Sequence, residues 1–513
     1  MESPVAGCAR LGDEVPPQLQ PSAPRQAADI KRVQDRWMRW TRDPQRHDWT
    51  FEWTAKPTIC QAKDLVDFYL DRGADLGIPK HLIWEYFTVR HFRQGRSNQL
   101  FLVEFFIPTY GLSGYSTFAM IMRLGVPKDP FYLVESEVAT MCFARRSGLP
   151  VPRVYSFDSS GANPLELEPI FMELVPGVNF KHWICDSGKD LKGQDLIKIL
   201  DEVQNKHLTL LEKTSFDQIG SLYYDWKGER GFFVGPSTAK VYWTGYRAQY
   251  VGQINRGPFD HITASLDSYL CAWEVELSDT RVYPKDRAHV RDLYHARTLI
   301  TETRRQLLPR LHAWGGRDAA YYIQGLNDTV ARTAWHRPHV GHGSLHHENL
   351  LIDPDTLKVT AIVDWEKSTV QPGPASPSMT YYLLWDTWGL CVDSRPPDDV
   401  AFSELVLVPT PKDDDLPGLI RVGEKDATEY LDAQDGMMGL LLPPQLQPPK
   451  DRVTGVSWTV MVLEEAIFSV SKSVEYYDRI LSETTVALDS EMVRRRAKYA
   501  AQVGRVQNRC KAR

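Results

Sequence analysis

The residues best suited to chemistry lie between positions 342 and 366, which read HGSLHHENLLIDPDTLKVTAIVDWE. The two apolar runs in this stretch predict a β-hairpin with its turn at Pro354-Asp355. Asn349 directly precedes the first strand and Asp364 ends the second, so the hairpin should bring the two side chains close together. Asn and Asp oxygens with room for water and phosphate are typical Mg²⁺ ligands, although an ordinary hairpin with polar ends has the same pattern.

Composition limits the class of protein that can carry this hairpin. The chain has 513 residues, 42% of them hydrophobic and 25% charged, which allows two or three packed units. Its net charge of -6 argues against bulk nucleic-acid binding, which needs a dense positive surface. No run approaches 18 uninterrupted apolar residues, so we expect no membrane span.

The cysteines and the N-terminus predict a compartment. The seven cysteines are scattered and never spaced as CxxC, which argues against a zinc cluster or a disulfide framework and fits a reducing environment. The N-terminal sequence has no basic segment followed by an apolar one, so no secretory signal is expected. The sequence therefore predicts a cytosolic protein.

The first third of the chain changes from a low-complexity start to a pattern of strands. Residues 1–28 are rich in Pro, Gln and Ala and are expected to be disordered, and residues 29–83 should form a helical extension with helices at 29–43 and 61–72. Residues 84–175 predict a hairpin around a turn at 95–98, a strand at 116–124, a helix at 132–148 and strands at 151–157 and 169–175. This order is that of a five-stranded antiparallel sheet with one helix.

Residues 176–493 are expected to be mainly helical, with amphipathic runs at 191–213, 262–277, 284–313 and 456–482, interrupted only by the hairpin described above. Two stretches, 396–418 and 443–449, have the composition of insertions. Residues 494–513 carry eight basic and no acidic side chains. We interpret this tail as a solvated terminal helix, with acidic lipid or nucleic acid as alternative partners.

Several ordered motifs match one family. The segment His342-Gly343-Ser344-Leu345-His346-His347-Glu348-Asn349, followed by Ile362-Val363-Asp364-Trp365-Glu366, resembles the HxDLHxxN brace and the following strand of aminoglycoside phosphotransferases and choline kinases. The blocks QGRSNQLFLV, SEVATMCFARRSGLPVPRVYSF and IGSLYY are similar to those of large fungal members of the altered-inheritance-of-mitochondria type. The similarity covers roughly residues 84–385. It implies an α+β, bilobal, protein-kinase-like fold in which a small antiparallel sheet with one helix precedes a larger helical lobe.

The resemblance also implies a set of binding roles. It implies ATP and Mg²⁺ as cofactors and an unidentified small molecule as the acceptor. Arg123 takes the position of the cation that grips the α- and β-phosphates, and Glu137 that of the carboxylate which holds this cation. The turn from Gly95 to Asn98 takes the place of the loop that covers the phosphates. The segment from Glu173 to Val175 corresponds to the adenine-contacting hinge, and Asn349 and Asp364 to the metal ligands.

The catalytic loop departs from the family pattern at one position. The family's base is the Asp of HxDLH, and this chain has Ser344 there. A serine hydroxyl has no useful basicity near neutral pH, and loss of a general base typically slows a reaction about 10²–10⁴-fold. His342 and His346 lie in the same loop. His346 is the first candidate for a replacement base, although a loop-supporting role is the simpler interpretation.

Three functions remain compatible with the sequence. The first is an ATP- and Mg²⁺-dependent phosphotransferase of doubtful kinase activity, the second a pseudokinase that binds nucleotide or a partner, and the third a kinase-fold enzyme with other chemistry on a metabolite. The resemblance adds mitochondria as an alternative location to the cytosol.

Overall fold

The computed structural model describes residues 16–20, 23–42, 49–109, 114–186, 216–226, 231–250, 252–278, 338–345 and 347–372, together with residues 199, 202, 203, 301, 304 and 305. The expected insertions at 396–418 and 443–449, the tail at 494–513 and the helix at 456–482 lie outside the described residues, as do almost all of the runs at 191–213 and 284–313. The chain divides into two compact units. The first unit comprises Met1–Val178, Gly220–Arg256 and Asn349–Thr369, and the second comprises the remainder.

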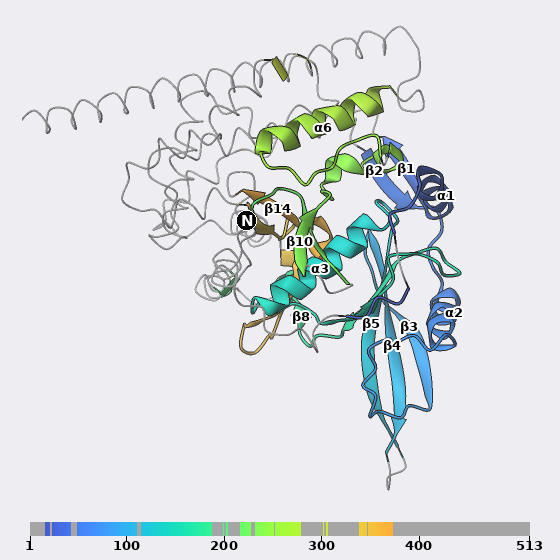
Figure 1. Ribbon diagram of the computed structural model, residues 1–513. Helices are drawn as coiled ribbons and strands as arrows, with labels where there is room; N and C mark the ends of the chain where they lie inside the picture. The colour runs from blue at the N-terminus through green and yellow to red at the C-terminus, as the bar shows by residue number, and fades with distance from the viewer. Residues whose placement is uncertain are drawn as a thin grey trace, which may run out of the picture. The chain divides into compact units, whose positions relative to one another are not determined.

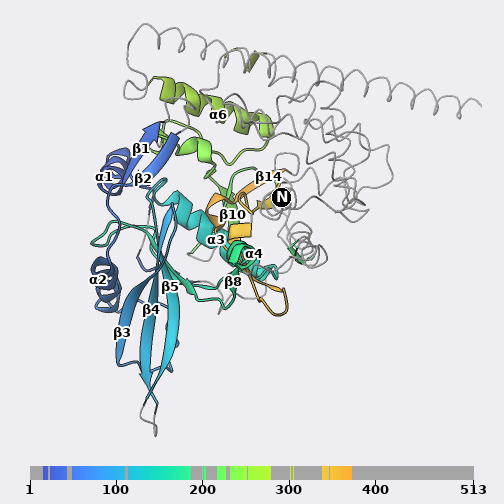
Figure 2. The ribbon, with the colours of Figure 1, turned by 180° about the vertical axis from the view of Figure 1, so that it is seen from behind.

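The first unit is built on an antiparallel sheet of five strands (Figures 1 and 2). The strand order is β3-β4-β5-β7-β6, and every neighbouring pair is antiparallel. The strands are β3 (Tyr86–Gln94), β4 (Asn98–Pro108), β5 (Tyr115–Gly125), β6 (Val154–Phe157) and β7 (Pro169–Glu173). These bounds confirm the five strands and the turn at 95–98 that the alternating hydrophobic pattern predicts.

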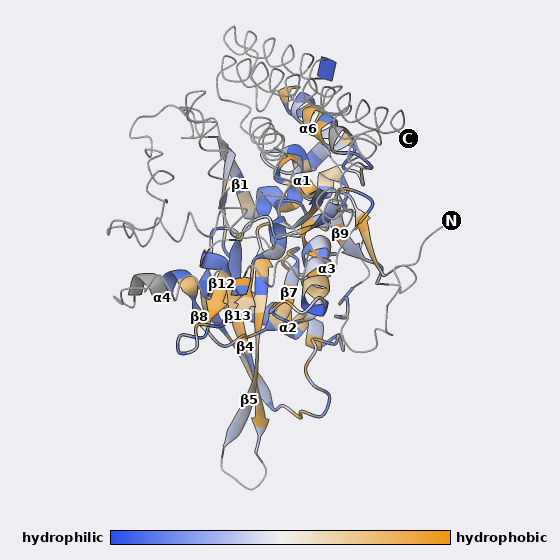
Figure 3. Cartoon of the chain, turned by 90° about the vertical axis from the view of Figure 1, so that its left-hand side faces the viewer, coloured by the Kyte–Doolittle hydropathy of each residue, from blue (hydrophilic) through white to orange (hydrophobic). Residues whose placement is uncertain are grey.

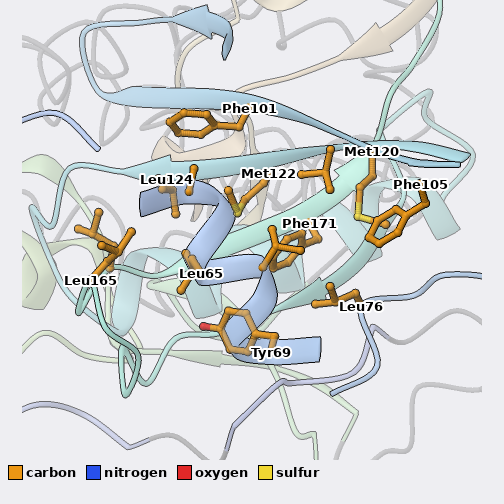
Figure 4. Packing of buried hydrophobic residues seen from close by; sticks show 14 of the residues in the cluster. Leu65, Tyr69, Leu76, Phe101, Phe105, Met120, Met122, Leu124, Leu165 and Phe171 are labelled. Atoms are coloured by element: carbon orange, nitrogen blue, oxygen red, sulfur yellow. The ribbon is translucent and has the colours of Figure 1, made fainter. Parts of the chain in front are cut away.

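One face of this sheet is covered by helix α2 (Ile59–Leu70). The helix begins with a capping box, in which the Thr58 side chain accepts from the Gln61 backbone and Gln61 caps in return. Its inward residues pack against alternate residues of β4 and β5 in one buried cluster (Figure 4), whose members include Leu65, Tyr69, Phe101, Phe105, Met122, Leu124 and Phe171. Helix α2 confirms the helix expected at 61–72.

The opposite face of the sheet holds helix α3 (Tyr132–Arg146). Since side chains alternate along a strand, Arg123 points away from the α2 side, where its neighbours Met122 and Leu124 lie, and it meets Glu137 on α3. The helix stops before Gly148, whose φ of 95° suits glycine. Eleven residues of α3 are buried. A helix buried on this scale needs cover on more than its sheet-facing side.

Part of that cover is a hairpin that the sequence pattern did not predict. Strands β9 (Ser221–Tyr224) and β10 (Phe232–Gly235) pair antiparallel, followed by the short helices η1 (Lys240–Tyr242) and η2 (Arg247–Tyr250). Trp226 beyond β9 donates its indole N–H to Glu135 of α3 at 2.6 Å. The expectation of a single hairpin after residue 176 is therefore wrong, because these two short aromatic strands resemble neither a helix nor a long alternating strand.

The N-terminal extension contains more β-structure than expected. Helix α1 (Ala27–Trp37) buries Ile30, Val33 and Trp37, as its spacing predicts, but it ends at Trp37 and not near residue 43. The chain continues as β1 (Met38–Arg42), which pairs with β2 (Trp49–Trp53). This pairing places Trp40 edge-on against Phe51, with ring centroids 5.6 Å apart. Tertiary aromatic contacts thus override the helical spacing of Trp40.

The expected disorder of residues 1–28 is also too broad. Residues 16–20 are extended and lie against β6, where the Leu19 N–H donates to the Phe157 carbonyl at 2.8 Å. The side chain of Gln18 donates to Glu135 at 2.7 Å. Backbone pairing fixes this segment, and its Pro- and Gln-rich composition does not reveal that partner.

The metal-candidate hairpin belongs to the first unit, although it lies far from the sheet in sequence. Strands β12 (Leu350–Ile352) and β13 (Val359–Ile362) pair antiparallel and are followed by η5 (Trp365–Lys367). Figure 3 shows hydrophobic residues along both strands, and most of them are buried. Gly177 permits the close approach of this hairpin, because a Cβ there would lie 2.5 Å from Thr360 Oγ1. The first unit therefore contains this hairpin and β9–β10 in addition to the segment before residue 176, and the expected lobe boundary at 175/176 stays a prediction.

The second unit contributes fewer described elements. They are α4 (Phe180–Asp186), α6 (Ile262–Leu277) and β11 (Pro338–Gly341), with β8 (Val178–Asn179), η4 (His347–Asn349) and β14 (Thr369–Pro372) at the junctions between units. Helix α6 matches the run expected at 262–277. Arg304 joins Asp267 and Glu274 of this helix through hydrogen bonds of 2.6 and 2.7 Å. Among the described residues, no helix has the length and apolarity that crossing a membrane requires.

A buried hydroxyl of α2 provides a test of this packing. The Tyr69 hydroxyl donates to Asp158 Oδ2 at 2.6 Å, and burial raises the pKa of Tyr69 far above its usual range, so the donor keeps its proton. Tyr69→Phe should lower the free energy of unfolding by about 1–3 kcal/mol, because a fully buried carboxylate loses a donor. Urea unfolding measures this loss. Tyr155→Phe is the matched control, since the hydroxyl of Tyr155 has no hydrogen bond within the described part of the chain. Equal losses in both variants would contradict the assignment.

Candidate active site

Arg123 on β5 is the centre of a buried ionic cluster. Its Nη1 donates to Glu137 Oε2 at 2.6 Å and its Nη2 to Glu366 Oε2 at 3.0 Å. Arg123, Glu137 and Glu366 are each at most 6% exposed. The structure thus brings together Arg123 and Glu137, as the resemblance implies, and adds Glu366 from η5. Because this guanidinium is held by two carboxylates, it has a fixed direction.

Lys128 completes the cluster, and the sequence analysis missed it. It follows β5 in the loop before α3, is 2% exposed, and donates to Glu366 Oε1 at 2.6 Å. It also lies 3.4 Å from the Ser97 hydroxyl in the 95–98 turn. Glu366 belongs to the Asp-Trp-Glu motif of the sequence. Lys128 belongs to no motif, and it is only a single charged residue after the apolar segment Gly-Val-Pro.

The cluster contains more acidic than basic groups. Two cations, Arg123 and Lys128, face three carboxyl groups, Glu137, Asp364 and Glu366, in this five-residue cluster. The exposed Lys367 lies outside the cluster and is a weaker attraction on Asp364 and Glu366. Burial opposes ionisation of all three, but Lys128 and Arg123 lower the pKa of Glu366 to about 2. Burial raises the pKa of Glu137 to about 7 against the pull of Arg123, and burial together with Glu366 raises the pKa of Asp364. One further positive charge would balance the cluster.

Asn349 and Asp364 meet at the end of the β12–β13 hairpin. The register pairs Leu350 with Ile362, and the Val363 N–H donates to the Asn349 carbonyl at 2.9 Å. As a result, Asn349 Nδ2 lies 3.4 Å from Asp364 Oδ2. Asp364 has a left-handed backbone with φ 67°, which is uncommon for a residue other than glycine or asparagine and occurs often at functional sites.

The two side chains are close enough to share a cation. Rotation of the Asn349 amide by 180° exchanges its nitrogen and oxygen. The oxygen then lies beside the Asp364 carboxylate. Among the described residues, no group of three His, Cys, Asp or Glu side chains is arranged to hold a metal. Two oxygen ligands with open positions for water and phosphate suit Mg²⁺, which rarely uses an all-protein cage.

The turn at 95–98 is short and closed. The Gly95 N–H donates to the Asn98 carbonyl at 2.8 Å, and a Cβ at Gly95 would meet that oxygen at an ordinary 3.5 Å. Gly95 is therefore not required by the turn's own packing. Asn98 Oδ1 is buried and has no hydrogen-bond partner among the described residues. A buried acceptor of this kind is suited to a ligand or water donor.

The expected hinge residues have different surroundings. The Glu173 side chain accepts from the Arg153 N–H at 2.9 Å and from Arg145 at 3.3 Å, and its own N–H donates to the Arg153 carbonyl. Glu173 is thus tied to the segment before β6. Val175 lies two residues beyond the end of β7 and is half-buried.

The loop with the family's base position lies in the second unit. His342 is buried, and its Nδ1 accepts from the Ser344 N–H at 3.3 Å across Gly343, which has φ 71°. A neutral His342 therefore carries its proton on Nε2. This contact orients the loop backbone, which is a positioning role. His346, the expected substitute base, lies outside the described residues.

The motif and its geometry agree with a comparison to protein families. The model of the phosphotransferase enzyme family matches residues 88–373, which is more than half of the chain. The chain belongs to the phosphotransferase enzyme family. This membership confirms the resemblance to aminoglycoside phosphotransferases and the α+β, kinase-like fold class expected from it.

Curated relatives of this phosphotransferase-family chain are fungal. A subtelomeric hrmA-associated cluster protein of Aspergillus fumigatus is 27% identical over 270 residues, 47% of this chain and 51% of the relative. The mitochondrial protein named altered inheritance of mitochondria protein 9 is 24% identical in Lachancea thermotolerans, over 47% of this chain and 42% of the relative. The same protein of Kluyveromyces lactis is 30% identical over 29% of this chain and 28% of its own length. The chain thus spans about half the length of the first two relatives or less.

Two solved structures have a partial likeness to this chain. A putative aminoglycoside phosphotransferase of Ralstonia eutropha has 13% identity and a TM-score of 0.36, with 84% of this chain and 98% of that one covered. An aminoglycoside phosphotransferase of Streptomyces rimosus has 12% identity and a TM-score of 0.34, with 80% and 99% covered. A likeness of this size carries no conclusion about activity.

The buried Glu137 makes stability depend on pH, because burial raises its pKa. Glu137 titrates near 7 in the folded protein but near 4.5 when unfolded, so its contribution is fully present below about pH 4.5 and is lost as the pH rises to about 7. Compared with the Glu137→Gln variant, whose side chain does not titrate, the parent should lose about 3 kcal/mol of unfolding free energy between about pH 4.5 and 7. Urea unfolding at intervals from pH 4.5 to 8 measures the difference. A difference that stays constant would mean that Arg123 keeps Glu137 ionised throughout.

Proposed function

We propose that this protein binds ATP with Mg²⁺ and transfers the terminal phosphoryl group to a hydroxyl of a small molecule, slowly because of Ser344. The observation that supports this most is the cluster of two cations and three carboxyl groups, one of which, Asp364, lies beside Asn349. A divalent cation at that pair supplies the missing positive charge. It leaves the site with a net positive charge, which favours a phosphate chain.

Each residue then has a defined task. The Asp364 carboxylate and the Asn349 amide oxygen hold Mg²⁺, which neutralises charge on the transferred group when bound. Arg123, kept in place by Glu137, donates to phosphate oxygens. The unpartnered Asn98 Oδ1 accepts from a nucleotide hydroxyl or a metal-bound water. Phosphoryl transfer depends mainly on such positioning and electrostatics.

Ser344 supports a second candidate, a nucleotide-binding protein without turnover. At the family's base position it offers no carboxylate to align and deprotonate an acceptor. The same feature fits a cleft that carries out other chemistry on a metabolite.

The names of the altered-inheritance relatives carry the word mitochondrial. We therefore propose mitochondria as the alternative location to the cytosol.

Nucleotide and metal binding can be separated by one substitution. In a thermal-shift assay, ATP with Mg²⁺ should stabilise the parent more than ATP with EDTA. Asp364→Asn should lose the Mg²⁺-dependent part only, because it removes a metal ligand's charge and leaves the other nucleotide contacts intact. Asp353→Asn, in the turn of the same hairpin, is the matched control and should behave as the parent. No stabilisation of the parent by ATP under either condition would refute the proposed function.

A carboxylate at position 344 tests whether only the base is missing. Ser344→Asp should raise ATP turnover between about ten- and a thousand-fold, because a positioned general base contributes on this scale. Ser344→Ala is the control and should give no gain. If nucleotide binds but Ser344→Asp leaves turnover at zero, the binding-only or other-chemistry alternative holds. If the parent already turns over at roughly 1–100 s⁻¹, another residue supplies the base.

A further inference from the structure

The buried Lys128 is a charged group for which the family resemblance supplies no role. The residue is 2% exposed, and its one carboxylate partner among the described ion pairs, Glu366, is shared with Arg123. The two cations therefore divide the two oxygens of one carboxylate, with Lys128 on Oε1 and Arg123 on Oε2. An ammonium has three donors, and the described hydrogen bonds of Lys128 use one for Glu366 Oε1 and place a second beside Ser97 Oγ, so a third can meet a ligand oxygen.

The surroundings of Lys128 limit the positions that a ligand oxygen could take. Its Nζ is 5.3 Å from the Phe51 ring centroid and 5.2 Å from that of Trp243, so aromatic faces hold the ammonium on two sides. It also lies 3.4 Å from Ser97 Oγ in the 95–98 turn. Arg96, the cation of this turn, is exposed and lies over Phe51 at 5.4 Å. Lys128, from the loop before α3, is thus the buried cation beside the turn.

We propose that Lys128 and Arg123 form a two-cation clamp for a polyphosphate chain, and that Glu366 is its placeholder in the ligand-free protein. A carboxylate that bridges two cations through separate oxygens occupies the position that two phosphate oxygens would take. When polyphosphate binds, its oxygens replace Glu366 on at least one cation. This inference rests on the proposed nucleotide function for the identity of the ligand. The clamp itself is defined by polyphosphate chemistry alone.

The clamp predicts opposite effects of two substitutions. Lys128→Met keeps the length of the side chain and its packing between two rings but removes the charge, so affinity for inorganic tripolyphosphate should fall about 10- to 100-fold. Glu366→Gln keeps both cations and weakens the competitor, so tripolyphosphate should bind more tightly than to the parent. Both are measured by isothermal titration calorimetry with Mg²⁺ present at the same concentration throughout, because the cation supplies positive charge that the cluster lacks. Lys358→Met, an exposed lysine in the β12–β13 turn, is the matched control and should bind as the parent does.

A second ligand series separates this inference from the proposed function. Adenosine affinity should be unchanged in Lys128→Met while ATP affinity falls, because the lost contact is to phosphate. Equal losses for adenosine and ATP, or an unchanged tripolyphosphate affinity, would overturn the clamp and leave nucleotide binding standing. If the parent binds tripolyphosphate in a Lys128-dependent way but neither adenosine nor ATP, the clamp is supported and the nucleotide function fails. Should Lys128→Met not fold, Glu366→Gln decides, and unchanged or weaker tripolyphosphate binding there overturns the proposal.

Discussion

The burial of four ionisable side chains, Arg123, Lys128, Glu137 and Glu366, at one end of the sheet is the constraint on which the rest of the site depends. They come from a strand, a loop, a helix and the end of a distant hairpin, with the half-buried Asp364 beside them, and each buried charge needs a partner. Two cations for three carboxyl groups leave the cluster short of positive charge. Burial, with a smaller effect of the neighbouring carboxyl groups, raises the pKa values of Glu137 and Asp364.

The scaffold explains how such a cluster can be tolerated. Alternation along β5 directs Met122 and Leu124 into the apolar core with α2 and leaves Arg123 on the α3 face, so one strand serves both layers. Cover from β9–β10 and η5 removes α3 from solvent, which fixes Glu137. Precise placement of charge before a ligand arrives is what electrostatic stabilisation of phosphoryl transfer requires.

The unusual features of this family member lie at different points of the same chemistry. Ser344 removes a carboxylate from the loop that normally aligns the acceptor, whereas Lys128 adds a cation where phosphate is expected. In our proposal, the first change weakens proton transfer and the second strengthens anion binding. The proposed protein is therefore one in which holding a phosphate chain matters more than rapid turnover. The opposite directions of these changes make the two functions separable by experiment.

The sequence alone determined the strands of the sheet, helices α2 and α3 and the β12–β13 hairpin, because these depend on local periodicity and turn signals. The pairing of Arg123 with Glu137 was implied by the family resemblance and is present in the structure. The sequence did not predict that α1 ends at Trp37, because the aromatic contacts that decide this join β1 to the separate strand β2. Nor could it predict β9–β10 or Lys128. The partners of Lys128, Ser97 and Glu366, lie 31 and 238 positions away, and only tertiary packing shows that they meet.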